Sequence, residues 1–364
     1  MKKITRRRFM KNSMLLGTAI TAFPAILTAK TKNAAPSAGI VVHPGVDNLR
    51  VVSTTDPMMT TDSKPICSWK QQNELVNTEV VYANIDKLAC ALAETNDTTS
   101  AWKTIFLKPP RKSWSNTTVA IKTNNIAYQH TRSAVMAKIC HTLTRTLGVA
   151  PHNIHIYDAG HGGNMHKKTP FADLPIGCRV EGKWGGFTTE VSIPEPWKGG
   201  GERSRCIKHL ANGTVDILIN IAMCKGHNIK FGGFSMTMKN HLGSFYPEPI
   251  HQGGGLDYLF AVNKTPEILG NSDTQTGKIL YPRQQLCLID ALWASKRGPG
   301  GLPSHQPNFL AMGVFSPVLD YLVATQFRGE RMGWKPNMKV VGRMLTDFGY
   351  KKTDLHNEGR LIEI

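Results

Sequence analysis

Residues 215–222, VDILINIA, decide the fold class of this 364-residue chain. Six of the eight residues are apolar, and they do not alternate with polar ones. Strands with such continuous apolar runs are buried on both faces, as in a parallel sheet covered by helices. We therefore expect a central strand here, with a layer of helices on each side.

The segments on either side of this strand predict the same kind of sheet. Residues 117–122 (TTVAIK) predict a strand, 133–147 a helix that ends before Gly148, and 153–158 (NIHIYD) a second strand. A strand, a short crossover helix and another strand are typical of parallel pairing. Further strands are expected at 286–291 and 308–314, and further helices at 83–94, 317–326 and 339–348. The fold class is therefore α/β, a mostly parallel sheet with helices on both faces.

The chain divides by composition into a core and several additions. The core α/β domain is expected at 113–350, after an irregular N-terminal extension (36–112) that packs on it, and before a C-terminal tail (351–364). An insertion at about 164–205 is rich in Gly, Pro, Trp and Thr and includes GKWGGFTTEVSIPEPWKGGGERS. We expect this insertion to form a hairpin or two over one end of the sheet.

Residues 1–35 have the order of an export signal. The basic segment TRRRFMK (5–11) contains paired arginines, and an apolar run at 14–27 follows it. That run is shorter than a membrane span of roughly 20 residues. Paired arginines are typical of twin-arginine (Tat) export, so the translocase is an expected partner and the periplasm the expected location. Imperfect cleavage sites end at Ala29 and Ala35, and an uncleaved signal would leave the protein on the cell envelope.

Charge and cysteine content limit the classes of function. The whole chain carries a formal charge of +18; residues 1–35 hold eight basic residues and no acid, so the remainder carries +10. This favours anionic ligands, anionic polymers of the envelope or lipid head groups. We find no run of basic residues with interleaved aromatics, so nucleic acid is not expected, and no apolar stretch after the signal could span a membrane. The seven cysteines include no C-x-x-C pair, so the chain has no iron–sulfur cysteine motif.

Polar residues follow three of the expected strands and a nearby Gly-rich segment. They are Lys122, Asn124, Asn125, Asp158, His161, Lys225, His227, Lys239, Asn240 and His241. Ligands of open parallel sheets bind beyond the carboxyl ends of the strands, so we expect these side chains to converge. Lysines, imidazoles and a carboxylate in one cleft suit an anionic substrate, with His or Lys transferring protons.

Each of these residues has an expected role and a structural alternative. The expected catalytic residues are Lys239, Asn240, His161 and Asp158. The expected substrate-binding residues are Lys122, Asn124, Asn125, Lys225, His227 and His241. The alternatives are surface lysines at strand ends, turn-forming asparagines and a turn-capping aspartate. His161, His227 and His241 are candidate ligands of a divalent metal, joined by Asp158 and His166, but no H-x-x-x-H spacing supports a ligand set.

The order of these motifs resembles a known family. The matching pieces are AIKTNN (120–125), His130-Thr131, IYDAG (156–160), VDILIN (215–220) with Lys225-Gly226-His227, MKNHLG (238–243), Ile289-Asp290-Ala291 and SPVLD (316–320). Together they resemble the domain of unknown function 362 of bacteria and archaea over about residues 115–350. Many relatives carry iron–sulfur cysteine motifs, which this chain lacks. The resemblance therefore implies architecture more than chemistry.

Two functions of different classes remain open. The first is an exported enzyme that acts on a small anionic or envelope-derived substrate through the Lys/His/Asp loops, with or without a metal or cofactor. The second is a non-catalytic ligand-binding or accessory protein of the cell envelope. No G-x-S-x-G, Walker or dinucleotide motif in a strand–turn–helix frame selects a particular reaction.

Overall fold

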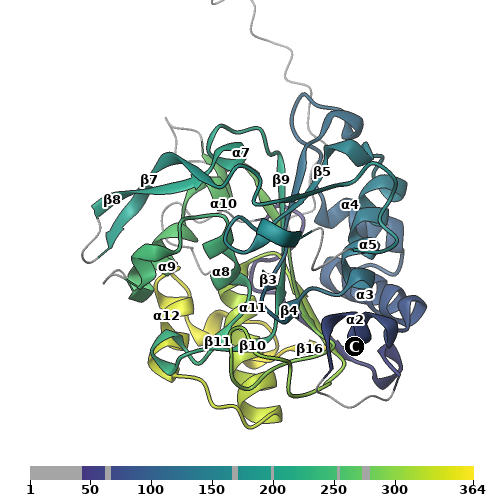
Figure 1. The fold of residues 1–364 in the computed structure, drawn as a ribbon, viewed down its shortest axis with the longest axis vertical. Helices are drawn as coiled ribbons and strands as arrows, with labels where there is room; N and C mark the ends of the chain where they lie inside the picture. Colours follow the sequence, from purple (N-terminus) through teal and green to yellow (C-terminus); the bar gives the residue numbers. More distant parts are fainter. Residues whose placement is uncertain (1–42, 62–66, 166–170, 198–200, 252–254, 273–278) are drawn as a thin grey trace, which may run out of the picture. The chain divides into compact units, whose positions relative to one another are not determined.

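The computed structural model describes residues 43–61, 67–165, 171–197, 201–251, 255–272 and 279–364 (Figure 1). In this part of the chain the main sheet has eight strands in the order β16-β1-β15-β14-β9-β2-β5-β6. The strands are β16 (Ile362–Glu363), β1 (Val52–Thr55), β15 (Phe309–Gly313), β14 (Gln284–Ala291), β9 (Ile217–Met223), β2 (Val119–Lys122), β5 (Ile154–Tyr157) and β6 (Arg179–Gly182). Only β15 is antiparallel to its neighbours among these strands. The predicted α/β class with a mostly parallel sheet is confirmed.

Both faces of the sheet are buried, as the apolar run of β9 predicts. Ile217, Ile219 and Ile221 belong to the hydrophobic core on one face, whereas Leu218 belongs to the core on the other. The same alternation holds in β2, β14 and β15. All seven residues of β9 are buried. This two-sided burial is the reason for its continuous apolar sequence.

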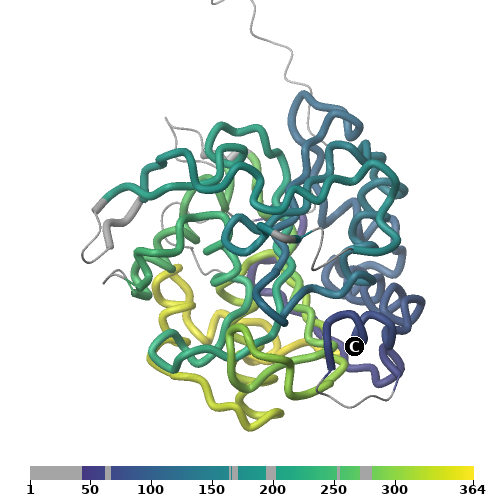
Figure 2. Tube along the Cα trace, in the orientation of Figure 1, coloured from purple at the N-terminus to yellow at the C-terminus, as the bar shows by residue number. Residues whose placement is uncertain are grey.

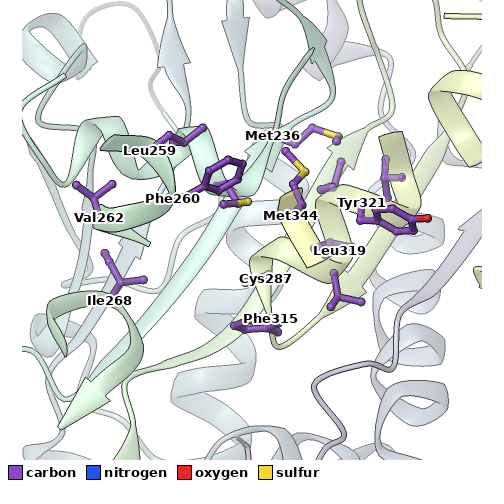
Figure 3. Packing of buried hydrophobic residues seen from close by; sticks show 14 of the residues in the cluster. Met236, Leu259, Phe260, Val262, Ile268, Cys287, Phe315, Leu319, Tyr321 and Met344 are labelled. Carbon is purple, nitrogen blue, oxygen red and sulfur yellow. The ribbon is translucent and has the colours of Figure 1, made fainter. Parts of the chain in front are cut away.

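Two layers of helices cover these faces (Figure 1). The first contains α3 (Thr78–Ala93), α4 (Thr98–Ile105) and α5 (Ser133–His141). The second contains α8 (Thr237–Asn240), α9 (Gly255–Val262), α11 (Ser316–Leu322) and α12 (Met338–Thr346), with the short α7 (Lys208–Ala211) and α10 (Pro266–Leu269). In the second layer, side chains of α9, α11 and α12 such as Phe260, Leu319 and Met344 gather over Cys287 of β14 (Figure 3).

The sheet extends beyond the expected core domain at both ends of the described chain. β1 comes from the predicted N-terminal extension and pairs with β15, and β16 comes from the predicted C-terminal tail and pairs with β1. Figure 2 shows the C-terminus beside the purple N-terminal part of the trace. The extension also supplies α2 (Trp69–Glu74) and the helices α3 and α4. These segments are therefore part of the sheet and its helical cover.

The predicted insertion contains one long hairpin, formed by β7 (Phe187–Trp197) and β8 (Gly201–Ile207). It also supplies β6, which pairs in parallel with β5 at the edge of the main sheet. A small pair outside this region, β12 (Gly270–Ser272) with β13 (Ile279–Pro282), precedes β14. The expectation of a hairpin is confirmed.

Helix boundaries differ from the predicted ones for local reasons. α3 begins at Thr78 rather than residue 83, because the side chain of Asn77 accepts a hydrogen bond from the Val80 amide and caps the earlier start. The α-helical part of the predicted helix 133–147 ends at His141, and a π-helical turn continues it over Thr142–Thr146. A similar π-helical segment, Val323–Arg331, follows α11. Among the described residues, we find no helix that is long and apolar enough to cross a membrane.

Candidate functional site

The expected site lies at the topological switch point of the sheet. From β2 the chain moves outward to β5 and β6, and it then returns to β9 and β14 on the other side of β2. Loops leaving β2 and β9 therefore diverge, and ligands of such sheets bind in the crevice between them. The residues after these two strands meet there, because Lys225 Nζ donates a 2.8 Å hydrogen bond to Asn124 Oδ1.

A buried ion pair lies beside this contact. Lys122 Nζ is 3.4 Å from Asp158 Oδ1, and the two side chains are only 1% and 2% exposed. Asp158 also accepts hydrogen bonds from the backbone amides of Asn125 (3.0 Å) and Gly160 (3.2 Å). Burial lowers the pKa of Lys122, and the Asp158 charge acts in the opposite direction. Asp158 therefore joins the ends of β2 and β5 and partly neutralises Lys122.

Asn240 connects the strands to α8. Its Nδ2 donates to Asn220 Oδ1 (2.8 Å) and to the carbonyl oxygens of Lys122 and Ile221 (3.2 Å each). Its Oδ1 accepts from Lys122 Nζ (3.1 Å) and lies 3.5 Å from Asn124 Nδ2. These contacts use both ends of the amide, and we therefore interpret Asn240 as a positioning residue.

Gly243, the glycine of the MKNHLG segment, lies directly against the ion pair. A Cβ on this residue would fall 2.6 Å from Lys122 Nζ and still closer to Lys122 Cε and Asp158 Oδ1. The Gly243 carbonyl also accepts a 2.9 Å hydrogen bond from the Ala159 amide. Only a residue without a side chain lets this turn approach the ion pair so closely.

Two further lysines lie in the same electrostatic environment. Lys225 is 2% exposed, and burial lowers its pKa well below the usual range. Asp158 opposes this decrease, whereas the charges of Lys122 and Lys239 add to it. Lys239 is half-buried, and burial lowers its pKa to about 7. Its Nζ lies 4.6 Å from the centre of the Phe231 ring.

His227 lies on the Phe231 side of the cluster. The two ring centres are 5.4 Å apart with an edge-on geometry. Burial lowers the pKa of His227 to about 3, and the charges of Lys239 and Lys225 contribute to this decrease. The imidazole is therefore neutral at physiological pH.

His241 has a structural environment. The ring is fully buried, with Nε2 2.7 Å from Gln284 Oε1 and 2.9 Å from Asn220 Nδ2, and Nδ1 3.2 Å from Ser244 Oγ. Burial lowers its pKa to about 3, although the Gln284 hydrogen bond acts in the opposite direction. Its contacts link α8 to β9 and β14, so we assign it a positioning role.

His161 lines a solvent-accessible pocket together with Asn125, another predicted residue. This polar pocket of about 210 Å³ is lined by Asn125, Ala127, His130, Gly160, His161, Gly163 and Lys183. Partial burial lowers the pKa of His161; Asp158 opposes the decrease, and the charges of Lys122, Lys225 and Lys183 add to it. The backbone carbonyl of His161 accepts a 3.2 Å hydrogen bond from Asn125 Nδ2. The pocket wall is thus tied to the buried ion pair through Asn125.

The ten predicted residues therefore fall into three groups according to their location. His161 and Asn125 line the polar pocket. Six form the buried network behind it: Lys122, Asn124, Asp158, Lys225, Asn240 and His241. Lys239 and His227 lie against Phe231. The predicted residues gather in one region, but only two of them are among the described residues that line the polar pocket.

The prediction missed residues that complete this region. Asn220 is buried in the middle of β9, and it contacts both Asn240 and His241. Its signal was an amide inside the apolar run VDILINIA. Lys183 of the insertion had no strand-end pattern and could not be found in this way.

Asp320 holds the start of α8 in place. Its carboxylate accepts hydrogen bonds from the amides of Thr237 and Met238 (2.9 Å each) and from Thr237 Oγ1 (2.5 Å). Burial raises the pKa of Asp320 to about 7, and these hydrogen bonds act against the increase. This cap positions the following residues, Lys239 and Asn240.

The candidate metal ligands do not form a metal site in the described chain. No group of three His, Cys, Asp or Glu side chains there is arranged to hold an ion. His227 packs on Phe231, and His241 is held by Gln284. His166 lies outside the described residues.

Comparison of the chain with protein-family models, with curated proteins and with solved structures finds no match. The resemblance to the domain of unknown function 362 stays a prediction. The functional argument therefore depends on the geometry of the site.

Proposed function

We propose that this protein is an enzyme that acts on a small anionic substrate, a carboxylate or a phosphate, bound in the polar pocket beside His161. One observation carries the proposal: the charges of Lys122 and Lys239 both act on the buried Lys225, and in the described chain only Asp158 is ion-paired with any of these three lysines. Burying uncompensated positive charge is costly unless an anion binds nearby or the amines lose protons.

The groups that line the polar pocket determine which reactions a bound substrate could undergo. In the pocket, Lys183, Asn125 and His161 offer a cation, an amide and an imidazole. The buried Lys122 and Lys225 do not line it, but their charges act on His161. A bound anion would be attracted by this field, and the lowered pKa of His161 supplies a neutral imidazole that can accept a proton. Asp158 keeps the pocket wall in place through the Asn125 and Gly160 amides.

The proposal includes export by the twin-arginine route. Its support is the paired-arginine segment 5–11 and the apolar run after it, which lie outside the described residues. An exported enzyme would meet its substrate in the periplasm or on the cell envelope.

A second candidate is a non-catalytic binding or accessory protein of the cell envelope. Burial of the lysines favours it, because Lys122 and Lys225 are 1% and 2% exposed and cannot attack a substrate in the pocket directly. Such a protein would use the same positive field for affinity alone.

The first experiment measures anion binding. Calorimetric titration with inorganic phosphate should show binding that weakens at least tenfold in Lys183→Gln and Lys225→Met, and that weakens with added salt. The matched control is Lys339→Met, which removes an exposed lysine of α12 and should leave the affinity unchanged. NMR should show that phosphate raises the pKa of His161, because a nearby anion stabilises the imidazolium.

Turnover of p-nitrophenyl phosphate, an anionic ester, then separates the two candidates. In hydrolysis, water attacks the ester, its proton passes to His161, and p-nitrophenolate leaves. Turnover that disappears in His161→Gln while phosphate still binds would support the enzyme. Phosphate binding without turnover of this ester would favour the binding protein. A wild-type protein that binds neither phosphate nor acetate would reject both.

A further inference from the structure

A larger cavity adjoins the polar pocket and has no role in the function proposed above. Its volume is about 860 Å³, and its lining includes Trp69, Thr78, Tyr128 and Ala134. Ala127 and His130 line both the cavity and the polar pocket. The two spaces therefore border each other at these residues.

A short hairpin stands where the two spaces meet. β3 (Asn125–Ile126) pairs with β4 (Gln129–His130), and Ala127 and Tyr128 form the turn. Ala127 has a φ of 49°, in the left-handed region. The turn is anchored to the chain at Gly300, because the Tyr128 amide donates a 3.4 Å hydrogen bond to the Gly300 carbonyl. Main-chain hydrogen bonds therefore hold this hairpin in place between the cavity and the polar pocket.

The walls of the two spaces differ in chemistry. The polar pocket presents Lys183, His161 and Asn125. In the cavity, Trp69 is 8% exposed, and its Nε1 already donates to the Thr131 carbonyl at 3.2 Å, so its ring is the surface it can offer a ligand.

The remaining cavity wall is mixed. Ala134, 7% exposed, adds apolar surface from α5, and Lys70, Glu74 and Asp173 also line the cavity. The ring centres of His130 and Trp69 are 5.7 Å apart, with the two rings nearly perpendicular, so this imidazole borders both environments. The aromatic and aliphatic part of the wall therefore lies next to the polar pocket.

We infer that the substrate is amphipathic, with an anionic group in the polar pocket and an apolar or aromatic body in the cavity. The inference rests on the function proposed above and adds the class of substrate. A volume of about 860 Å³ lies within the range of roughly 300–1,000 Å³ for ligand sites, so the cavity can enclose a body much larger than the anionic group. Each methylene that enters the cavity strengthens binding about fourfold.

The test uses a series of ligands that differ only in chain length. Calorimetry compares inorganic phosphate with ethyl, butyl, hexyl and octyl phosphate, and runs the carboxylates of equal chain length as a second arm. The dissociation constant of the wild-type protein should fall with each added methylene. The arm that shows the steeper fall identifies the head group as phosphate or carboxylate.

Two variants each add a ring to the lining of the cavity. Ala134→Phe adds a ring from α5, and Ala172→Phe adds one from an exposed position of the lining that tolerates substitution more readily. The matched control, Ser115→Phe, adds the same ring at an exposed position before β2, outside the cavity lining. Both cavity variants should lose the chain-length dependence and keep the wild-type affinity for inorganic phosphate, whereas the control should keep both.

The outcomes separate this inference from the proposed function. If inorganic phosphate binds but chain length has no effect in the wild type, the amphipathic substrate is rejected and the anion site stands. If chain-length dependence persists in both cavity variants, the body does not enter this cavity and the inference fails. If neither inorganic phosphate nor any alkyl anion binds, the anion site and the inference both fail.

Discussion

Gly243→Ala should destabilise the protein, because the added Cβ would collide with the buried Lys122–Asp158 pair. The added Cβ would lie 2.6 Å from Lys122 Nζ, whereas non-bonded atoms prefer about 3.5–4.0 Å. φ at this residue is not positive, so alanine can adopt the backbone conformation and the cost comes from contact alone. Overpacking costs about 1–3 kcal/mol, and separating a buried ion pair about 3–5 kcal/mol. We expect the free energy of unfolding to fall by about 2–4 kcal/mol.

Urea unfolding followed by tryptophan fluorescence measures this change, with an unchanged m-value showing that the transition stays comparable. The matched control is Gly342→Ala in α12, where no atom lies within 4 Å of the added Cβ. This control should gain about 0.5–1 kcal/mol, because alanine favours helix over glycine. In a Lys122→Ala background, Gly243→Ala should cost less, because part of the clash is gone. If Gly243→Ala matches the wild type in stability, the close approach is not as described and the reasoning fails.

Two further predictions concern pH. The pKa of Lys239 is about 7 in the folded protein, whereas its ordinary value is 10.5. Between these two pH values the unfolded chain binds more protons than the folded one, so the free energy of unfolding rises with pH. The rise is at most about 1.4 kcal/mol per pH unit. Lys239→Met should reduce this rise in urea unfolding at pH 7.5 and 9.5; equal rises in both proteins would contradict it. The pKa of Asp320 is about 7 when folded and 3.8 as its ordinary value, so the folded state binds the extra proton and stability falls as pH increases from about 4 to 7. Asp320→Asn should flatten this fall between pH 4.5 and 6.5, and an unchanged slope would show that Asp320 does not titrate there.

The parallel core could be predicted from sequence because each signal was local and repeated. The run VDILINIA required burial on both faces, and β9 is buried at every position. The loops after β2, β5 and β9 share one edge of the sheet in any parallel arrangement, so the convergence of Lys122, Asp158 and Lys225 followed from topology.

The edges of the sheet could not be predicted in the same way. β1 and β16 are four and two residues long, and their pairing joins residues about 310 positions apart in sequence. Strands this short carry too few side chains for a periodic pattern. The contact is specified by the tertiary fold, in which Thr54 Oγ1 donates to the carbonyl of Ile364.

The burial of the site residues could not be predicted either, because a position just after a strand does not determine how deeply a side chain is buried. A lysine after a strand can point to solvent or into the crevice, and the sequence around Lys225 does not distinguish these. The structure places Lys225 in the interior, where it is hydrogen-bonded to Asn124, and the turn at Gly243 closes over the neighbouring Lys122–Asp158 pair. The same closure takes Asn240 and His241 away from any substrate and gives them structural contacts.

Because the switch point is closed, the buried lysines that produce the positive field are not the residues that line the polar pocket. Charges buried at low dielectric act over longer distances than solvated ones, so Lys122 and Lys225 can attract an anion they never contact. Burial lowers the pKa of His161, and the charges of these two lysines add to the decrease, whereas a bound anion would raise it. Anion binding and proton uptake by His161 are therefore coupled: each should strengthen the other by the same factor. Under the proposed function, such a site would need few ligand contacts, because its affinity would come mainly from charges that the fold has already buried.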